Sequence, residues 1–210
     1  MSLKKTPLDP TAASALYTSE EEKMLAGEYY NPLDPVLVKK RENARRFCEK
    51  LAQLYNHVDK DKKAELTKEL FGTGGEHVAI EPPIYVDYGT NIHFKGSAFF
   101  NFNCVILDVA RVDIGRGTIF GPGVQIYTAA HPLEPELRLQ ELEYANPIKI
   151  GDNVWVGGSA IICPGITIGD NSVVATGSVV TKDVPPMVVV AGNPARVIKH
   201  LESSVDAAKQ

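Results

Sequence analysis

The sequence predicts a mainly β protein in which a parallel β-helix follows a short helical region. Between Ile150 and Val180 every sixth residue is β-branched and aliphatic, and the residue after each is usually small. The set is Ile150, Val156, Ile162, Ile168, Val174 and Val180. A period of six fits neither an α-helix nor a simple strand, and hexapeptide repeats are typical of parallel β-helices. Each unit supplies a short strand and a corner, so that stacked coils bury a column of aliphatic side chains.

Composition limits the classes of function. The 210 residues suffice for one domain with an appendage, and the net charge of -4 argues against non-specific binding to nucleic acid or acidic membranes. The three widely spaced cysteines form no CxxC pair, so we predict neither a disulfide framework nor a zinc site. The N-terminus lacks an apolar signal core and no apolar run reaches membrane length. We therefore expect a cytoplasmic protein.

Helix signals precede the repeat. Residues 1–18 are rich in Thr, Ser, Pro and Ala and are expected to form a flexible tail, followed by a helical cap over 19–75. Ser19 and Glu22 form a capping box for a first helix that Gly27 ends. Asp34 caps a second helix with Pro35 at its first position.

Two further boundaries complete the predicted cap. The apolar stripe of the second helix ends at Asn56. A third short helix is expected from about Asp61 to Leu70, closed by Gly72.

The hexad period occupies residues 76–200. Its first positions are Ile80, Val86, Ile92, Ala98, Cys104, Ile114, Phe120 and Ile126, with a register slip near Asp108–Arg111. Residues 128–147 are polar, contain proline and have no hexad character, so we expect a loop that projects from the β-helix wall. Long loops of this kind are usually functional. A last apolar strand precedes a polar tail over 201–210. The flat faces of such a prism make threefold association natural.

His131 is the strongest catalytic candidate among five histidines. It lies in the projecting loop beside several acidic residues, and histidine is the natural general base for a hydroxyl or an amine near neutral pH. The other histidines lie at a helix end, in a linker, in the repeat or in the tail, without the spacing of a metal site. Cys104 and Cys163 occupy wall positions, where a thiol packs as a small apolar group.

Other polar residues allow two interpretations. Asp87, Asn101 and Asp108 either satisfy backbone groups at corners or bind the hydroxyls of an acceptor. A cationic cluster after the last coil either forms a solvated surface or binds the phosphates of a nucleotide-like cofactor. That cluster consists of Lys182, Arg196 and Lys199.

Several motifs together resemble the maltose/galactoside O-acetyltransferase branch of the hexapeptide-repeat acyltransferases. They are EKMLAGEYYNPLDPVL, EPPIYVDYGTNIHF, NFNCVILD, TAAHPLEPELR, NVWVGGSAIICPGITIGDNSVVATGSVVTKDVPP and AGNPARVIK, and they span roughly residues 20–200. The resemblance implies a left-handed β-helix, a homotrimer with active sites between subunits, acetyl-CoA as donor, and a sugar or other small hydroxylated acceptor. It implies no metal.

The resemblance also implies roles for particular residues. His131 falls on the catalytic histidine, Asn101 on the asparagine beside it, and the Phe100 backbone on a proposed oxyanion contact. The implied acceptor-binding residues are Asp34, Asp87, Asp108 and Glu143. The implied coenzyme A residues are Gly158, Thr176, Thr181, Lys182, Arg196 and Lys199, and with outward-facing Trp155 they are expected to form one long groove leading to His131.

Departures from the family pattern leave the acceptor open. Val109 replaces a second acidic residue of the galactoside enzyme, Glu143 replaces an apolar residue on the acceptor side, and Gly158 stands where a serine can occur. We expect direct acetyl transfer to a sugar hydroxyl with His131 as base. The alternatives are an N- or O-acetyltransferase acting on an amino acid or amino sugar, and a non-enzymatic β-helix scaffold.

Overall fold

The computed structural model describes residues 7, 9, 10, 12, 16–54 and 58–202. Most of the expected N-terminal tail, nearly all of the C-terminal tail, and Asn56 lie outside the described residues. The predicted end of the second helix at Asn56 is wrong, because that helix ends at Ala52 with Gln53 as its C-cap residue. Within the described part of the chain, no helix combines the length and apolar character needed to cross a bilayer.

The helices begin and end mostly where the sequence signals place them. α2 (Glu20–Ala26) has the predicted capping box and ends at Gly27, whose φ of 73° is the left-handed conformation that glycine tolerates. α3 (Pro35–Ala52) begins at Asp34, and α4 (Lys60–Leu70) follows it. A short 3-10 helix, η1 (Gly75–His77), leads into the first strand.

Gly72 does not close α4 as predicted, because Phe71 is the C-cap residue. Gly72 serves packing instead: a Cβ there would lie 2.3 Å from the carbonyl oxygen of Thr90.

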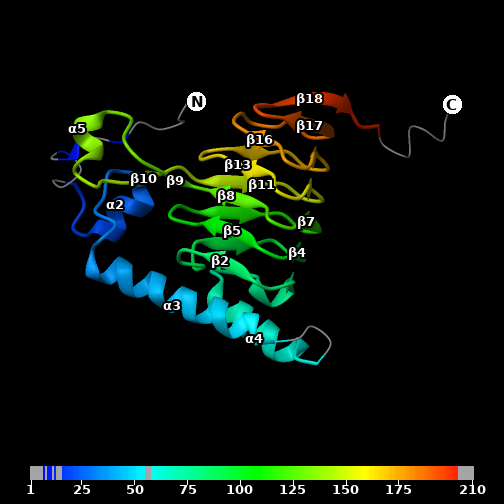
Figure 1. Cartoon of the computed structure of the whole chain (residues 1–210), viewed down its shortest axis with the longest axis horizontal. Helices are drawn as coiled ribbons and strands as arrows, with labels where there is room; N and C mark the ends of the chain where they lie inside the picture. The colour runs from blue at the N-terminus through cyan, green and yellow to red at the C-terminus, as the bar shows by residue number, and fades with distance from the viewer. Residues whose placement is uncertain (1–6, 8, 11, 13–15, 55–57, 203–210) are drawn as a thin grey trace.

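The strands form a three-faced parallel β-solenoid of about six turns (Figure 1). The first face contains β1 (Val78–Ile80), β4 (Ala98–Phe100), β7 (Thr118–Phe120), β12 (Trp155–Val156), β15 (Val173–Val174) and β17 (Val188–Gly192), with β18 (Ala195–His200) antiparallel at its edge. The second face contains β2 (Ile84–Val86), β5 (Cys104–Leu107), β8 (Gln125–Tyr127), β13 (Ile161–Ile162) and β16 (Val179–Val180). The third face contains β3 (Ile92–Phe94), β6 (Val112–Ile114), β11 (Ile148–Ile150) and β14 (Thr167–Ile168).

The predicted fold class, a mainly β parallel helix with a helical cap and a projecting loop, is confirmed. Figure 1 shows α3 and α4 running across the N-terminal end of the stack, where they cover the first coil. α2 lies at one side of the stack, beside the projecting loop.

Two inward side chains per strand fill the solenoid, rather than the single one that the hexad predicts. The second position lies two residues earlier and is often small, as with Ala98 before Phe100 and Ser172 before Val174. Phe100 and Phe120 stack in successive coils with their ring centroids 4.3 Å apart. This alternation of small and large groups lets successive layers interdigitate.

One edge of the prism departs from the repeat. Most corners insert three residues between inward positions, as 101–103 do between Phe100 and Cys104. The corner between the second and third faces instead inserts residues 87–91, 107–111 and 127–147 in three successive coils. We call these three segments the wide corner. The predicted register slip near Asp108 and the predicted loop are therefore two parts of one feature.

Candidate active site

The projecting loop of the wide corner has structure of its own. β9 (Ala129–Ala130) pairs antiparallel with β10 (Tyr144–Ala145), and a single helical turn, α5 (Pro135–Arg138), lies between them. The Arg138 guanidinium donates to the carbonyl oxygens of Pro132 and Leu133, each at 3.0 Å. The hairpin therefore presents His131, which directly follows β9, from a braced segment.

The His131 ring is oriented by the opposite strand of the hairpin. Its Nδ1 lies 3.2 Å from the carbonyl oxygen of Leu142. A carbonyl can only accept, so Nδ1 carries the proton in the neutral ring and Nε2 keeps a free lone pair. Nε2 lies 3.7 Å from Oε1 of Glu143. The half-exposed imidazole thus has the tautomer that a general base needs.

Glu143 is fixed by Tyr30, which lies between α2 and α3. Their backbones pair in both directions, with N–O distances of 2.9 and 3.1 Å, and the Tyr30 hydroxyl donates to Oε2 of Glu143 at 2.5 Å. Burial, together with the neighbouring Glu143 carboxylate, raises the pKa of Tyr30. The phenol therefore stays protonated and remains a donor to Glu143.

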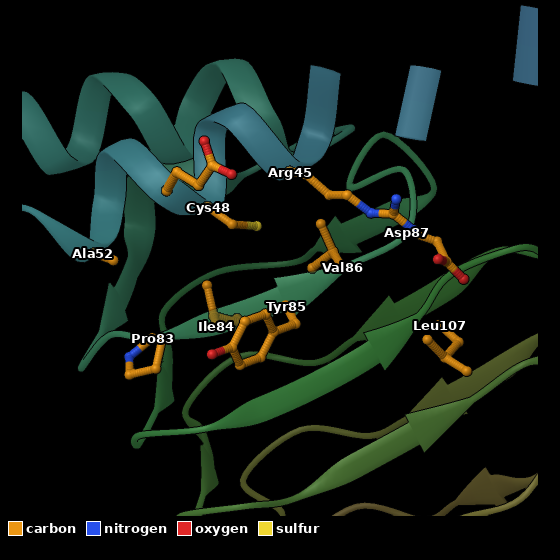
Figure 2. Close-up of a pocket in the computed structure, with 10 residues that line it drawn as sticks. Arg45, Cys48, Ala52, Pro83, Ile84, Tyr85, Val86, Asp87 and Leu107 are labelled. Carbon is orange, nitrogen blue, oxygen red and sulfur yellow. The ribbon is translucent and has the colours of Figure 1, made fainter. Parts of the chain in front are cut away.

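Asp87 stands two coils below the projecting loop, beside a cavity of about 470 Å³ between α3 and the second face. Figure 2 shows Arg45 extending from α3 toward Asp87, with the Tyr85 ring along the β2 side of the cavity. Burial raises the pKa of Asp87, while Arg41 and Arg45 oppose that shift. Arg41 also donates to the Tyr88 hydroxyl at 2.8 Å. The wide corner therefore combines a histidine, two carboxylates and a cavity.

The cysteines offer no activated nucleophile. Burial raises the pKa of Cys104 to about 11 and also raises the pKa values of Cys48 and Cys163. A thiol in this state is not the thiolate that covalent catalysis needs. Among the described residues, no group of three or more His, Cys, Asp and Glu side chains is placed to hold a metal ion.

Comparisons with known proteins connect this architecture to one family. Residues 23–75 match the maltose acetyltransferase hexapeptide capping motif, and residues 147–182 match the hexapeptide repeat of succinyl-transferase. The galactoside O-acetyltransferase of Escherichia coli is 42% identical over 86% of this chain and 88% of its own length. The chain belongs to the maltose/galactoside O-acetyltransferase family. It is thus an acetyltransferase of the hexapeptide-repeat class.

Solved structures of this family have the same fold. A maltose O-acetyltransferase from Clostridium difficile matches with a TM-score of 0.85 and 46% identity, over 89% of this chain and 99% of its own. A hexapeptide-repeat acetyltransferase from Vibrio cholerae, complexed with acetyl coenzyme A, matches with a TM-score of 0.80 and 38% identity, over 89% of this chain and 100% of its own.

Two residues to which the family resemblance assigns acceptor contacts have structural roles here. The Asp108 carboxylate is fully buried, and its Oδ1 accepts the backbone N–H groups of Asp87 and Tyr88 at 3.0 and 2.9 Å. Oδ1 of Asp34 accepts from Val36 and Leu37 and so caps α3. The acceptor role implied for Asp108 stays a prediction, and its observed contacts are those of a buried carboxylate that holds the turn at residues 87–91. The observed contacts of Asp34 are those of a helix cap.

Asn101 and Phe100 lie at a different edge of the prism from His131. Phe100 ends β4, and Asn101 begins the narrow corner between the first and second faces, which residues 81–83, 101–103, 121–123, 157–159 and 175–177 form. Oδ1 of Asn101 accepts from the Phe102 N–H at 2.8 Å, and the Phe100 carbonyl accepts from Glu81 at 2.8 Å. The strands of the second face separate the two corners, so a single chain does not bring Asn101 to His131.

The residues expected to bind coenzyme A lie at both of these edges and on the first face. Gly158 and Thr176 lie at the narrow corner, where the Gly177 N–H donates to the Gly158 carbonyl at 2.9 Å. Thr181 and Lys182 follow β16 at the other edge, and Trp155 is exposed on the outer side of the first face. Arg196 and Lys199 lie on β18. Within one chain these residues do not line a single surface, and the coenzyme A groove stays a prediction for a site between subunits.

Sequence reasoning missed Tyr30, Tyr88 and Arg41. Each reaches the site through tertiary contacts over long sequence separations, and no spacing in the sequence marks them. The register slip did mark the right corner, but its first occurrence at residues 87–91 escaped notice. Val86 is the second inward residue of β2, and Ile92 is the first inward residue of β3. They lie six residues apart only because this corner is two residues longer than the others, so the hexad count shows no interruption there.

Proposed function

We propose that the protein transfers the acetyl group of acetyl-CoA to a hydroxyl of a sugar, with His131 as the general base. The observation that carries this proposal is the orientation of the His131 ring, whose Nδ1 faces the Leu142 carbonyl and whose Nε2 faces the polar wide corner. Several relatives are O-acetyltransferases of maltose or galactosides by name, which supports a sugar as the acceptor.

The acceptor would bind against Asp87 and the cavity below it. Asp87 is partly open to solvent, and its carboxylate can accept hydrogen bonds from sugar hydroxyls. The exposed Tyr85 ring beside the cavity offers an apolar surface for the face of a pyranose. Of the four carboxylates predicted to bind the acceptor, Asp87 has the strongest support.

The donor would use the exposed cations near the C-terminal coils. Lys182, Arg196 and Lys199 are exposed and can pair with the phosphates of acetyl-CoA. Gly177 leaves open space where a side chain would otherwise begin, which permits close approach along the narrow corner beside Thr176. The complex of a Vibrio cholerae relative with acetyl coenzyme A supports this donor.

Transfer would be direct. Nε2 of His131 takes the hydroxyl proton as the acceptor oxygen attacks the thioester carbonyl, the carbon–sulfur bond breaks, and the proton then passes to the departing coenzyme A sulfur. A backbone N–H at Phe100 would stabilise the oxyanion. The raised pKa values of the three thiols support a mechanism without an acyl-enzyme.

The active unit would be a homotrimer with its sites between subunits. The outward residues of the first and second faces are mostly apolar, including Ile119, Trp155 and Tyr85, whereas the third face presents polar residues such as Asp113 and Lys149. Two apolar faces on each prism suit closure around a threefold axis. A neighbouring copy could then bring the narrow corner, with Asn101, to the wide corner with His131.

Replacing His131 with alanine tests the proposal. We expect the rate of coenzyme A thiol release, with acetyl-CoA and a sugar acceptor, to fall by about 10²–10⁴-fold. His77→Ala is the matched control, because that exposed histidine lies in η1. A loss below about tenfold, with the assembly intact by light scattering, would exclude His131 as the base. A panel of glucose, maltose, galactosides, serine and amino sugars would identify the acceptor.

A further inference from the structure

We propose that Glu143, held by Tyr30, is the counter-charge for the imidazolium that forms on His131 during acetyl transfer. The inference rests on the proposed function, since it assigns a positioning and electrostatic role at the same site. It gives Glu143 a different task from the acceptor contact that the family resemblance implies, and it makes Tyr30 of the helical cap part of the active site.

The two carboxylate oxygens of Glu143 have different partners. Oε2 accepts the Tyr30 hydroxyl at 2.5 Å, and Oε1 lies 3.7 Å from Nε2 of His131. Because one oxygen is held by a buried phenol, the other is fixed in direction toward the reacting nitrogen. The backbone bridge between residues 30 and 143 adds two further hydrogen bonds to the same junction.

The gap between Glu143 and His131 suits a charge that appears only during the reaction. In the neutral ring Nε2 carries no proton, so 3.7 Å separates two acceptors and no hydrogen bond forms. When the acceptor proton arrives on Nε2, the ring becomes a cation beside a fixed carboxylate. The attraction is therefore greater in the transition state than in the ground state, which is the condition for raising kcat.

Tyr30 is well suited to anchor this carboxylate. Its side chain is only 1% exposed and packs in an apolar cluster with Met24, Leu37 and Tyr88. A group so enclosed has little freedom to move, and its hydroxyl faces Glu143. The cap thus does more than cover the open end of the solenoid, because the segment between α2 and α3 sets the position of Glu143.

The experiment measures kcat and both KM values for three variants, with acetyl-CoA and the acceptor that the panel identifies. Glu143→Gln keeps the shape and the Tyr30 hydrogen bond but removes the charge, and we expect kcat to fall about tenfold with the KM for acetyl-CoA unchanged. Tyr30→Phe should lower kcat by about threefold. In Glu143→Gln/Tyr30→Phe the second change should add less than about twofold, because Tyr30 acts only through Glu143.

Two controls separate this role from general effects of the substitutions. Glu141→Gln removes a neighbouring exposed carboxylate of the same loop, and Tyr29→Phe removes the adjacent phenol, whose ring packs edge-on against Tyr144. Both should keep the kcat of the parent. Thermal unfolding of each variant checks that the fold is retained.

Three results would overturn the inference. A wild-type kcat in Glu143→Gln would show that the charge is not used. A change confined to the acceptor KM would show that Glu143 binds the acceptor instead, and additive effects in the double variant would show that Tyr30 acts by another route. His131→Ala, measured alongside, distinguishes the two proposals. If His131→Ala loses activity while Glu143→Gln keeps the kcat of the parent, the counter-charge role of Glu143 is rejected and His131 remains the general base.

Discussion

Replacing Asp108 with asparagine should remove much of the pH dependence of stability between about pH 4 and pH 7. The Asp108 carboxyl is fully buried beneath the wide corner, and burial raises its pKa from 3.8 to about 7 against the opposing effect of backbone hydrogen bonds. The folded state thus holds this proton more tightly than the unfolded chain does. Its stabilising effect is complete below about pH 4 and is lost as the pH rises through about 7.

The size of the effect follows from the shift. A change of about three pH units at 1.36 kcal/mol each corresponds to about 4 kcal/mol in total, of which about 2–3 kcal/mol falls between pH 5 and pH 8. In Asp108→Asn this contribution is absent at every pH. The amide keeps one oxygen for the Asp87 and Tyr88 N–H groups but turns a donor toward the Asn91 N–H, which costs about 1–3 kcal/mol at low pH.

The assay is urea unfolding at pH 5 and pH 8, at one protein concentration so that any effect of self-association is the same in every measurement. Relative to Asp108→Asn, the parent should lose about 2–3 kcal/mol on going to pH 8. Asp61→Asn, an exposed carboxylate on α4, is the control and should keep the parent's pH dependence. Equal pH dependence in the parent and Asp108→Asn would refute the argument that burial governs this carboxyl.

Two further predictions concern the narrow corner and the donor. In Gly157→Ala the new Cβ would lie 2.5 Å from the Thr176 backbone nitrogen, so we expect about 1–3 kcal/mol of destabilisation in thermal unfolding. Gly177→Asn should be nearly neutral, because the φ of 69° at Gly177 suits asparagine and no atom lies near the new Cβ. Lys182→Gln and Arg196→Gln should each raise the KM for acetyl-CoA about threefold to tenfold, with kcat unchanged. The increase in KM should be smaller at high salt, because salt screens the charges. Unchanged KM values would show that these cations do not bind the donor.

The fold could be predicted largely because the hexad is a local pattern. A period of six with β-branched residues has few other structural explanations, and helix caps such as Ser19 and Asp34 act within four residues. The second inward position escaped prediction because it is not uniformly aliphatic, and alanine or serine occupies it in several coils. Its burial becomes apparent only when whole coils stack, as with Ser172, which contacts Pro185 and the first residue of β17.

The site could be predicted less completely, for reasons of geometry. His131 stood out because it lies in an interruption of the repeat. The predicted coenzyme A residues do not share one edge of a single chain, because Thr176 and Thr181 lie at consecutive corners of the prism. How these corners meet between subunits depends on association, which the hexad pattern does not encode. The contacts of Tyr30 were not predictable, since they join segments 113 residues apart.

The wide corner explains how a regular solenoid gains chemistry. Strands with three-residue corners leave little room for functional side chains, because each corner is occupied in turning the chain. Lengthening the same corner in three successive coils stacks the additions. The Asp108 carboxylate accepts the Asp87 N–H from the turn below it, and the Thr128 hydroxyl of the coil above donates to the Leu107 carbonyl and accepts the Ala110 N–H. Each insertion thus supports the next, and the longest one presents His131. Tyr30, between α2 and α3, bonds to Glu143 of the projecting loop. The helical cap therefore supports the candidate site as well as the fold.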